Sequence, residues 1–473
     1  MAEGRRSSGA AAGPTVGVIG GGLAGLAAAC AVADASYRVT VFERKPFLGG
    51  RAASYELPGT GEVVDNCQHI LLGCCTNLTN FCERLGVSAK IRWYDRLTFL
   101  APGGQQGSTA PSRLPAPFHA APAFLGYPHL SLADKLSIAR GMFALIEGIP
   151  GSDGDFLQWL RAHRQTERAI ARFWSPVLVS ALNEELSGVS VHYGAMVFRD
   201  AFLKSAAAGR LGVPTVPLSE LYGEAAGYIA QRGGEVRLRC TVESFMPSTN
   251  GVTVRTAQGV HRFDYLISAV PFHMLSELLP PGAEAEALAR SVAPLRTVPI
   301  TGIRLWFDRE ITPLEHAVLL DRTIQWMFQK SKILSRTRED GPPSGSYLEL
   351  VVSASRSLLE KPRAEIVELA LRELAEFFPA VREAKLLKST VVKEVHATFA
   401  PSPESAAARL QPQTAWPRVF LSGDWTATGW PATMEGAVRG GYLTAEALAS
   451  AAGDARRFLV PDLPAQGIMR MFR

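Results

Sequence analysis

The sequence has few cysteines and lacks a long, uninterrupted hydrophobic run. Its 473 residues include six cysteines, none of which forms a C-x-x-C pair or stands at zinc-binding spacing. Such usage excludes the common structural zinc sites and is typical of reduced, buried thiols in a cytosolic protein, so we expect no metal ion. Residues 16–33 are almost wholly apolar, but glycines interrupt their first half. This stretch therefore predicts a strand, a tight turn and a helix, and not a membrane span.

An excess of charge of one sign is also missing. The chain carries 49 Lys and Arg against 44 Asp and Glu, a net charge of +5, and these residues are spread along its length. Without a basic stripe, no nucleic acid partner is expected. A mildly basic protein is still compatible with anionic lipid headgroups. With 47% hydrophobic residues, the chain can bury a large core and is expected to form two domains.

The N-terminal part predicts a β-α-β unit. Thr15–Ile19 and Arg38–Phe42 are short β-rich runs, and the helical segment Leu23–Ala33 lies between them. Because both strands are nearly all apolar, we expect a parallel sheet that is covered on both faces.

The turn of this unit predicts a dinucleotide site. Gly20, Gly22 and Gly25 leave room for a diphosphate to approach the backbone, and the helix that follows directs its free N–H groups at the phosphates. Glu43 ends the second strand, where a carboxylate accepts hydrogen bonds from ribose hydroxyls. The residues expected to contact the dinucleotide are Gly20, Gly22, Leu23, Ala24, Gly25 and Glu43.

The residues after Glu43 favour FAD over NAD. Arg44 follows the ribose acid, and Gly49-Gly50-Arg51 stands at the spacing that lets the backbone pass close to the diphosphate and ribityl chain. This arrangement resembles the E-x-x-x-x-x-G-G-R motif of flavin amine oxidases and phytoene desaturases. The resemblance implies FAD as the cofactor, with Arg44, Gly50 and Arg51 among its contacts.

A second motif near the C-terminus points to the same cofactor. A short strand runs into Gly423-Asp424, where Asp424 fits a ribityl or diphosphate contact or, alternatively, caps the segment. A helix then opens near Met434, and its N-terminus would face the flavin N1–C2 edge, where reduction places negative charge. Val242 lies where relatives hold adenine through a strand's backbone.

The remaining periodicity predicts a discontinuous α/β fold, in which a Rossmann-like FAD-binding domain of the amine-oxidase or glutathione-reductase type is interleaved with an α+β substrate domain. Strands are predicted at Glu235–Arg239, Val252–Val254, Tyr265–Ser268 and Arg418–Ser422, and an antiparallel sheet at Thr301–Phe307 and Tyr347–Ser353. Helices are predicted at Ser131–Ile149, Phe156–Arg172, Arg363–Phe378 and Thr433–Ala451, and an irregular excursion at Gly104–Pro128.

These elements divide the chain into expected domains. The FAD-binding domain comprises residues 15–100, 205–295 and 395–455. The substrate-binding domain comprises residues 101–204, which carry a helical insertion, and residues 296–394. Residues 1–14 are expected to form a disordered tail, and residues 456–473 a C-terminal tail.

Further motifs resemble the squalene-associated FAD-dependent desaturases, whose members are now assigned as hydroxysqualene dehydroxylases. The similarity extends over nearly the whole chain. Its motifs are Asp65–His69, Phe173–Pro176 with Ala181–Asn183, Phe198–Asp200, Gly423–Gly429 and Pro431–Ala437. One residue departs from the pattern, since Cys67 stands where family members usually have glycine. Its side chain puts the local backbone shape, or close contact of this loop with the substrate, in doubt.

The resemblance implies reductive dehydroxylation of hydroxysqualene to squalene, a step of squalene and hopanoid biosynthesis. Such a reaction needs a proton donor beside the leaving hydroxyl and a dry, apolar tunnel. Asp65 and His69 are the candidate donors, although His69 could be a structural residue and Asp65 could instead hold the loop together. Asp200, beside Arg199, is more typical of an ion pair than of an acid.

Other functions share the cofactor motifs. A carotenoid or phytoene desaturase, which runs the flavin in the opposite direction, is the main alternative, and a flavin amine oxidase is a weaker one. Non-enzymatic prenyl-binding proteins share the fold but have lost much of the flavin site, whereas these motifs are intact here.

A C30 isoprenoid substrate is nearly insoluble in water, so we expect a cytoplasmic protein that lies peripherally on the inner face of the membrane. Leu114–Leu125 and Gly467–Arg473 mix apolar residues with arginine and are candidates for this contact, with ordinary domain packing as the alternative. The sequence leaves open the electron donor that reduces the flavin and the oligomeric state.

Overall fold

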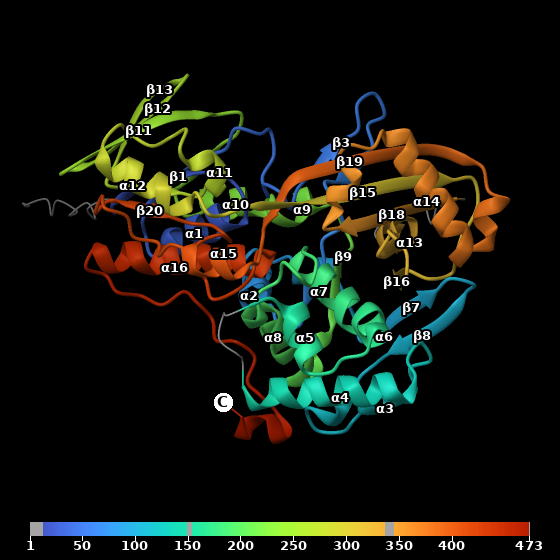
Figure 1. The fold of residues 1–473 in the computed structure, drawn as a ribbon. Helices are drawn as coiled ribbons and strands as arrows, with labels where there is room; N and C mark the ends of the chain where they lie inside the picture. Colours follow the sequence, from blue (N-terminus) through green and yellow to red (C-terminus); the bar gives the residue numbers. More distant parts are fainter. Residues whose placement is uncertain (1–12, 149–153, 336–344, 473) are drawn as a thin grey trace, which may run out of the picture.

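The computed structural model describes residues 13–148, 154–335 and 345–472. The expected N-terminal tail, residues 1–14, falls outside these ranges except for its last two residues. At the centre of one half of the molecule is a five-stranded sheet in which every neighbouring pair is parallel (Figure 1). Its strands, in spatial order, are β10 (Glu235–Arg237), β2 (Arg38–Phe42), β1 (Thr15–Ile19), β14 (Tyr265–Ser268) and β20 (Val419–Leu421). The predicted parallel sheet and its β-α-β unit are therefore confirmed.

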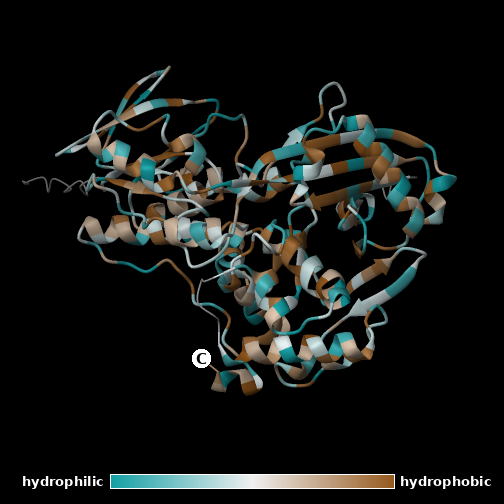
Figure 2. Cartoon of the chain, in the orientation of Figure 1, coloured by the Kyte–Doolittle hydropathy of each residue, from teal (hydrophilic) through white to brown (hydrophobic). Residues whose placement is uncertain are grey.

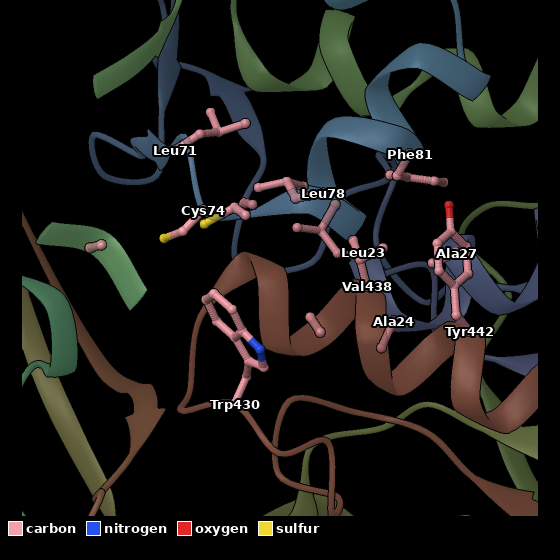
Figure 3. Close-up of a cluster of buried hydrophobic side chains, with 14 of the residues drawn as sticks. Leu23, Ala24, Ala27, Leu71, Cys74, Leu78, Phe81, Trp430, Val438 and Tyr442 are labelled. Carbon is pink, nitrogen blue, oxygen red and sulfur yellow. The ribbon is translucent and has the colours of Figure 1, made fainter. Parts of the chain in front are cut away.

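Two helices cover one face of this sheet. Helix α1 (Leu23–Asp34) is rich in alanine and buried along nearly its whole length, and it packs against α16 (Met434–Ala451). Figure 3 shows Leu23, Ala24 and Ala27 of α1 meeting Val438 and Tyr442 of α16. The small side chains of α1 let the two helix backbones approach closely: a Cβ atom added at Gly441 would lie 2.4 Å from the carbonyl oxygen of Ala24. The opposite face of the sheet packs against a three-stranded antiparallel sheet.

That small sheet is formed by β11 (Val242–Ser248), β12 (Gly251–Thr256) and β13 (Gly259–Phe263). Its Phe245 and Val254 pack with Phe42 and Leu266 of the parallel sheet. The parallel sheet is thus covered on both faces, as its apolar strands predict.

The second half of the molecule is built on a seven-stranded, mostly antiparallel sheet. Its strands, in spatial order, are β19 (Leu386–Phe399), β15 (Thr297–Phe307), β18 (Ser346–Ser353), β17 (Trp326–Gln329), β16 (His316–Leu319), β7 (Leu97–Ala101) and β8 (Gln105–Thr109). Helix α14 (Arg363–Phe377) packs on one face and contributes to its core. The predicted antiparallel sheet and the helix that follows it are confirmed.

The edge of this sheet corrects two expectations. Gly104–Pro128 is not irregular throughout. Strand β8 pairs with β7, and a 3-10 helix (Phe118–Ala120) and helix α3 (Ala121–Leu125) follow it. Strand β7 begins within residues 15–100, the segment expected to belong to the cofactor domain, yet it pairs with β16 of the large sheet. The domain division stays a proposal, with β7 moved to the substrate-binding part. Periodicity could not place β7, since strand partners far apart in sequence leave no local signal.

Helices form a layer beneath the large sheet (Figure 1). The segment Phe156–Arg172 is not one continuous helix: Arg164 adopts a left-handed conformation with φ of 55°, and Thr166 caps a new helix. The layer comprises α4 (Leu132–Glu147), α5 (Phe156–Ala162), α6 (Glu167–Ala169), α7 (Ser175–Leu182) and α8 (Val191–Phe198), with π-helical turns at Ile170–Trp174 and Arg199–Leu203. Stacked and edge-on aromatic rings, among them Phe156, Trp174 and Phe198, hold it together.

Shorter elements complete the chain. The strands are β3 (Ser54–Glu56), β4 (Val63–Asp65), β5 (Leu71–Leu72), β6 (Ile91–Tyr94) and β9 (Leu211–Pro214), and the helices are α2 (Thr76–Arg84), α9 (Leu218–Tyr222), α10 (Glu224–Ala230), α11 (Phe272–Leu275), α12 (Ala283–Val292), α13 (Lys330–Ser335) and α15 (Pro403–Ala408). β9 lies in a three-stranded sheet with β5 and β6.

The C-terminal tail is docked along the molecule. The backbone N–H and carbonyl oxygen of Val460 both form hydrogen bonds with the side chain of Asn77. Arg439 forms an ion pair with Asp462, and the backbone N–H of Ile468 donates to the carbonyl oxygen of Ala116 at 3.0 Å. It ends in a short 3-10 helix at Gly467–Met471. Within the described residues, no helix is both long and apolar enough to cross a membrane.

The close packing of α1 on α16 can be tested with two glycine substitutions. Gly441→Ala should destabilise the protein by about 1–3 kcal/mol, because its methyl group would overlap backbone atoms of α1. Gly227→Ala, in α10 with open space around it, should be neutral or stabilise by about 0.4–1 kcal/mol. Urea unfolding followed by far-UV circular dichroism measures both. Equal midpoints for the two variants would contradict the packing argument.

Candidate functional site

A cavity of about 630 Å³ lies at the carboxyl ends of the parallel strands and reaches the large sheet. Ile19 and Phe42, the last residues of β1 and β2, line it from one side, and Phe328 and Val351 of the large sheet line it from the other. Ligands of α/β sheets bind at the carboxyl ends of the strands, so this is the candidate site.

The near end of the cavity is a backbone cradle made of glycines. Gly20, Gly49 and Gly50 have φ values of +105°, +103° and +65°, which disfavour any residue with a side chain. A Cβ atom added at Gly50 would lie 3.0 Å from the Cα atom of Gly22. With no side chains in the way, the first residues of α1 lie open to the cavity, and Gly20, Gly22, Leu23 and Ala24 all line it. This geometry suits a diphosphate at the N-terminus of a helix.

Gly25 was expected to contact the dinucleotide, but its role is in helix packing. It does not line the cavity, and a Cβ atom there would lie 2.0 Å from the carbonyl oxygen of Gly20. Gly25 therefore allows α1 to pack closely on the preceding turn, and its contribution to the site is indirect.

Glu43 lies at the cavity wall and is itself well bonded. Its Oε2 accepts the N–H of Gly21 at 2.7 Å, and its Oε1 accepts the N–H of Lys45 at 2.7 Å. A carboxylate has about four acceptor positions, so each oxygen keeps capacity for a ribose hydroxyl. The two backbone bonds fix the carboxylate where the motif predicts it.

Asp424 and Arg51 meet across the cavity although 373 residues separate them in the sequence. The Asp424 Oδ1 atom lies 2.7 Å from Arg51 Nη2, while Arg51 Nη1 donates to the carbonyl oxygen of Ala397 at 2.7 Å. Gly423 and Gly50 line the cavity beside them. The two predicted flavin motifs therefore form one surface.

The other expected cofactor contacts also line the cavity: Arg44, Val242 and Met434. Met434 is the first residue of α16, whose N-cap Thr433 accepts the N–H of Gly436 at 3.0 Å. Thr433, Met434 and Glu435 all line the cavity, so the N-terminus of α16 lies at its wall. Cradle, ribose acid and second helix N-terminus together fit FAD.

The far end of the cavity is an apolar chamber. Its wall carries side chains from the helical layer and from the large sheet, listed here: Ile70, Leu72, Met196, Val197, Ile300, Trp326, Phe328 and Val351. Trp430 and Met434, which follow Gly423-Asp424 in the sequence, line the same cavity. The two ends are continuous, so a long hydrocarbon could lie against a flavin without leaving the cavity.

His69 is placed in the cavity wall as expected. Its Nδ1 lies 2.7 Å from the carbonyl oxygen of Cys67, which fixes the neutral ring with its proton on Nδ1. Burial lowers the pKa of His69, more than its bond to Cys67 raises it. A neutral ring of this tautomer presents Nε2 as an acceptor, so His69 is better suited to receive a proton than to donate one.

Cys67 is accommodated by a glycine in the facing strand. Its Sγ atom lies 3.0 Å from the place that a Cβ atom of Gly302 on β15 would take. Burial raises the pKa of the Cys67 thiol to about 12, so it stays protonated. The extra side chain is therefore absorbed by the neighbouring strand, and the loop keeps its place in the cavity wall.

Asp65 is not placed as a proton donor. It does not line the cavity, and its carboxylate accepts from Ser54 at 2.7 Å, from the N–H of Leu218 at 3.0 Å and from Lys330 Nζ at 2.9 Å. Burial alone would raise the pKa of Asp65, but Lys330 and these hydrogen bonds outweigh it and lower the pKa. An ionised, fully bonded carboxylate holds the loop in place, which was the alternative.

Sequence reasoning missed the charges around Asp65. Lys330 Nζ also donates to Gln68 at 3.0 Å and lies 3.9 Å from Glu349, while Arg304 Nη2 donates to the carbonyl oxygen of Asn66 at 2.8 Å. Lys330, Arg304 and Glu349 are essentially inaccessible to solvent. Burial raises the pKa of Glu349 even with both cations near it. Lys330, Arg304 and Glu349 belong to a helix and two strands whose sequence patterns are ordinary. Only their burial in the folded chain distinguishes them from surface charges.

Asp200 lines the cavity and pairs with Lys204, one helical turn away, and not with the neighbouring Arg199. Burial raises the pKa of Asp200 despite this partner. The predicted ion pair is present, with Lys204 as the partner, and it lies at a position that faces the chamber.

No metal site accompanies these residues. In the part of the chain that the structure describes, no group of three or more His, Cys, Asp or Glu side chains is arranged to hold a metal ion. All six cysteines are buried and none is paired in a disulfide.

Comparison with known proteins gives a consistent family. The model of the flavin containing amine oxidoreductases matches residues 23–449. The chain is 27% identical to a 15-cis-phytoene desaturase of Synechococcus elongatus, over 92% of this chain and 95% of that protein. It is 26% identical to a probable zeta-carotene desaturase of the same organism, over 92% of this chain and 98% of that protein.

A solved structure shows the same fold. An oxidoreductase from Methanosarcina mazei superposes with a TM-score of 0.70 at 18% identity, over 90% of this chain and 98% of that one. The expected architecture, a Rossmann-like FAD-binding domain interleaved with an α+β domain, is confirmed.

The ribose acid can be tested by substitution. Glu43→Ala should weaken FAD binding by roughly 10- to 150-fold, since a hydrogen bond to a charged group contributes about 1.5–3 kcal/mol. Glu43→Gln, which keeps one acceptor, should lie between wild type and Glu43→Ala. Titration of the apoprotein with FAD, followed by quenching of flavin fluorescence, gives the dissociation constants.

The control for this test is Glu243→Ala, which removes an exposed carboxylate next to Val242 that does not line the cavity. Its FAD affinity should equal that of the wild type. If Glu43→Ala retained FAD as tightly as Glu243→Ala, the ribose site would lie elsewhere.

The buried ion pair predicts a strong and pH-dependent effect. Lys330→Met should destabilise the protein by about 3–5 kcal/mol, because it leaves Asp65 as an uncompensated buried charge. Lys332→Met, which removes a surface pair with Glu310, should cost at most about 1 kcal/mol. Chemical unfolding at neutral pH compares the two.

The difference between wild type and Lys330→Met should shrink in acid. In the wild type the pKa of Asp65 is lowered, so its stabilisation is present above about pH 4, the ordinary pKa, and is lost as the pH falls through the folded-state value. In the variant, burial without Lys330 raises that pKa, so protonation relieves the cost. A difference that stays constant between neutral pH and pH 4 would contradict this account.

Proposed function

Because the chain belongs to the flavin containing amine oxidoreductase family and is an FAD-dependent oxidoreductase, we propose that its substrate is a long isoprenoid chain. The observation that carries this proposal is the continuity of the cavity. An apolar chamber of large aliphatic and aromatic side chains opens directly onto the dinucleotide cradle. The relatives named above as carotenoid desaturases support the same substrate class.

The cofactor would be held by residues that the cavity brings together. Gly20, Gly22 and the start of α1 would bind the diphosphate, Glu43 the adenosine ribose and Asp424 the ribityl chain. Bound FAD would supply two-electron chemistry by taking up or giving a hydride. The chain itself binds and orients the substrate and excludes water from the reacting carbon.

Two reactions fit an isoprenoid in this chamber. The comparisons favour dehydrogenation of a carbon–carbon bond, since the relatives carry the names of phytoene and zeta-carotene desaturases. We therefore propose a carotenoid-type desaturation first. The sequence motifs favour reductive dehydroxylation of hydroxysqualene to squalene, which we retain as the second candidate.

Two residues at the chamber wall suit different reactions. Dehydroxylation needs a proton for the leaving hydroxyl, and Asp200 brings a carboxyl group with a raised pKa to the wall of the chamber. His69, with its acceptor nitrogen free to receive a proton, is suited to the opposite task, which desaturation needs. Asp200 would therefore act as the proton donor in dehydroxylation, and His69 would act as the proton acceptor in desaturation.

The substrate's insolubility bears on where the protein acts. We propose a cytoplasmic protein that lies peripherally on the inner face of a membrane and takes its substrate from the bilayer. The reductant or oxidant that returns the flavin to its starting state would be a separate partner.

A two-arm assay tests the function. Oxidised enzyme is incubated with phytoene, and pre-reduced enzyme is incubated anaerobically with hydroxysqualene, each in detergent micelles. Desaturated product in the first arm alone supports the carotenoid reaction, and squalene in the second alone supports dehydroxylation. Glu43→Ala, with little FAD bound, gives the background. Oxidation of putrescine with no change in either isoprenoid would overturn the isoprenoid proposal.

A further inference from the structure

Helix α4 carries an apolar stripe on its outward side. Leu132, Leu136 and Phe143 recur at helical spacing and expose 71%, 64% and 60% of their surface. The inward side of the helix already supplies its packing through Ile138 and Leu145. The outward stripe therefore contributes nothing to the core of the chain.

The stripe continues over neighbouring segments. Lys135 Nζ of α4 donates to the carbonyl oxygen of Leu125 at the end of α3, and the C-terminal 3-10 helix is bonded through Ile468 to Ala116. Figure 1 shows α3, α4 and the C-terminal helix along the same edge of the molecule, and Figure 2 shows hydrophobic residues along them. We call this surface the α4 face; its exposed apolar residues are Leu114, Phe118, Leu125, Leu132, Leu136, Phe143, Ile468, Met471 and Phe472.

The concentration of exposed apolar residues on this face is unusual. Nine of the 15 large hydrophobic residues exposed among the described residues belong to it, and Met471 exposes 81% of its surface. The other six are spread over β4, β11, β13 and β19 and the turn after β10. Contiguous apolar patches on a soluble protein mark interaction surfaces.

The charges around the α4 face favour an anionic partner. Arg113, Arg140 and Arg470 are exposed within it, and Lys135 lies beside them. Over residues 112–148 and 466–472, the acidic residues are Asp134, buried in the cap of α4, and Glu147 at its far end. Apolar side chains interspersed with arginines are the pattern of a surface that lies in the headgroup region of a bilayer.

A second cavity lies between the α4 face and the flavin site. Its volume is about 980 Å³, and its wall includes Gly148 at the end of α4 and Arg470 and Phe472 of the C-terminal helix. Charged side chains line much of it, among them the ion pairs Asp200–Lys204 and Arg439–Asp462. It shares Met196, Asp200 and Trp430 with the first cavity, so the two cavities adjoin at these residues. We call this second cavity the vestibule.

We propose that the α4 face docks on a lipid bilayer that carries anionic headgroups, so that the charged vestibule lies at the level of the headgroups and the apolar chamber lies behind it. Supply of substrate from this bilayer rests on the proposed isoprenoid substrate, whereas the docking stands on the surface alone. The membrane was expected to contact Leu114–Leu125 and the tail Gly467–Arg473. The structure adds α4 as the central element, while Arg473 lies outside the described residues.

Vesicle flotation tests the docking with no substrate present. The FAD-loaded protein is mixed with vesicles of phosphatidylcholine alone or with an equal share of phosphatidylglycerol. The wild type should float with the anionic vesicles, and raising the salt from about 0.1 to about 0.5 M should weaken that binding because the Debye length shortens. Leu132→Glu, Leu136→Glu and Phe143→Glu combined should lower the bound fraction at least about tenfold, since these side chains would enter the interface.

A matched triple variant controls for added charge. Met246→Glu, Val260→Glu and Leu387→Glu place three carboxylates at exposed apolar positions on β11, β13 and β19, away from the α4 face. This control should float as the wild type does apart from a small electrostatic loss. Flavin absorbance confirms that both variants are folded and loaded. Equal loss in both variants, or no flotation of the wild type, would overturn the docking.

A second copy of the chain is the competing occupant. If the α4 face were a dimer interface, the wild type would sediment as a dimer and the α4 triple variant as a monomer, with flotation equal in both; that result would overturn the proposal. Supply of substrate from the bilayer has its own measurement. With substrate supplied in vesicles the α4 variant should lose turnover at least about tenfold, and with substrate in detergent micelles it should turn over as the wild type does. Loss of turnover in micelles as well would place the defect in the chemistry and not in docking.

Discussion

The buried pair of Asp65 and Lys330 connects the two halves of the site, and the rest of the cavity depends on it. Asp65 ends β4 beside the cofactor part, whereas Lys330 follows β17 of the large sheet. The four residues after Asp65 form the cavity wall between cradle and chamber. A buried ion pair is costly to break, because either partner alone would be an unpaired charge in a medium that solvates it poorly. The pair therefore holds this loop, and with it His69, at one distance from the cradle.

The same arrangement separates two environments that the proposed chemistry needs side by side. A diphosphate requires close backbone and oriented N–H groups, which glycines and helix ends supply. A hydrocarbon requires a wall without unpaired polar groups, which Trp326, Phe328 and their neighbours supply. Trp430 and Met434 follow Gly423-Asp424 of the second flavin motif in the sequence and line the same cavity. Because one short segment carries the flavin motif and these two side chains, the position of the chamber is linked to that of the cofactor.

Local patterns were sufficient for much of this architecture. The strands around α1 were predicted from periodicity, and Gly20, Gly22 and Glu43 from their spacing, since a diphosphate site is built from neighbours in the sequence. The Gly49-Gly50-Arg51 motif was assigned to the flavin through its resemblance to known flavin motifs. Asp65 was misjudged as a donor because its partners, Leu218 and Lys330, lie 153 and 265 residues away. Arg164, which interrupts the predicted helix, gave no signal, because a left-handed residue other than glycine or asparagine has no compositional mark.

The parallel sheet and the dinucleotide cradle could be predicted from the sequence, because both rest on residues that act through their immediate neighbours in the chain, and the resemblance of short motifs to known flavoproteins added FAD and the family. Folding sets which charges are buried, which face of α4 is left outward and where the chamber opens. Leu132 and Leu145 are equally apolar in the sequence, yet one is exposed and the other is buried. Burial is a property of what packs against a residue, and the packing partners come from distant parts of the chain.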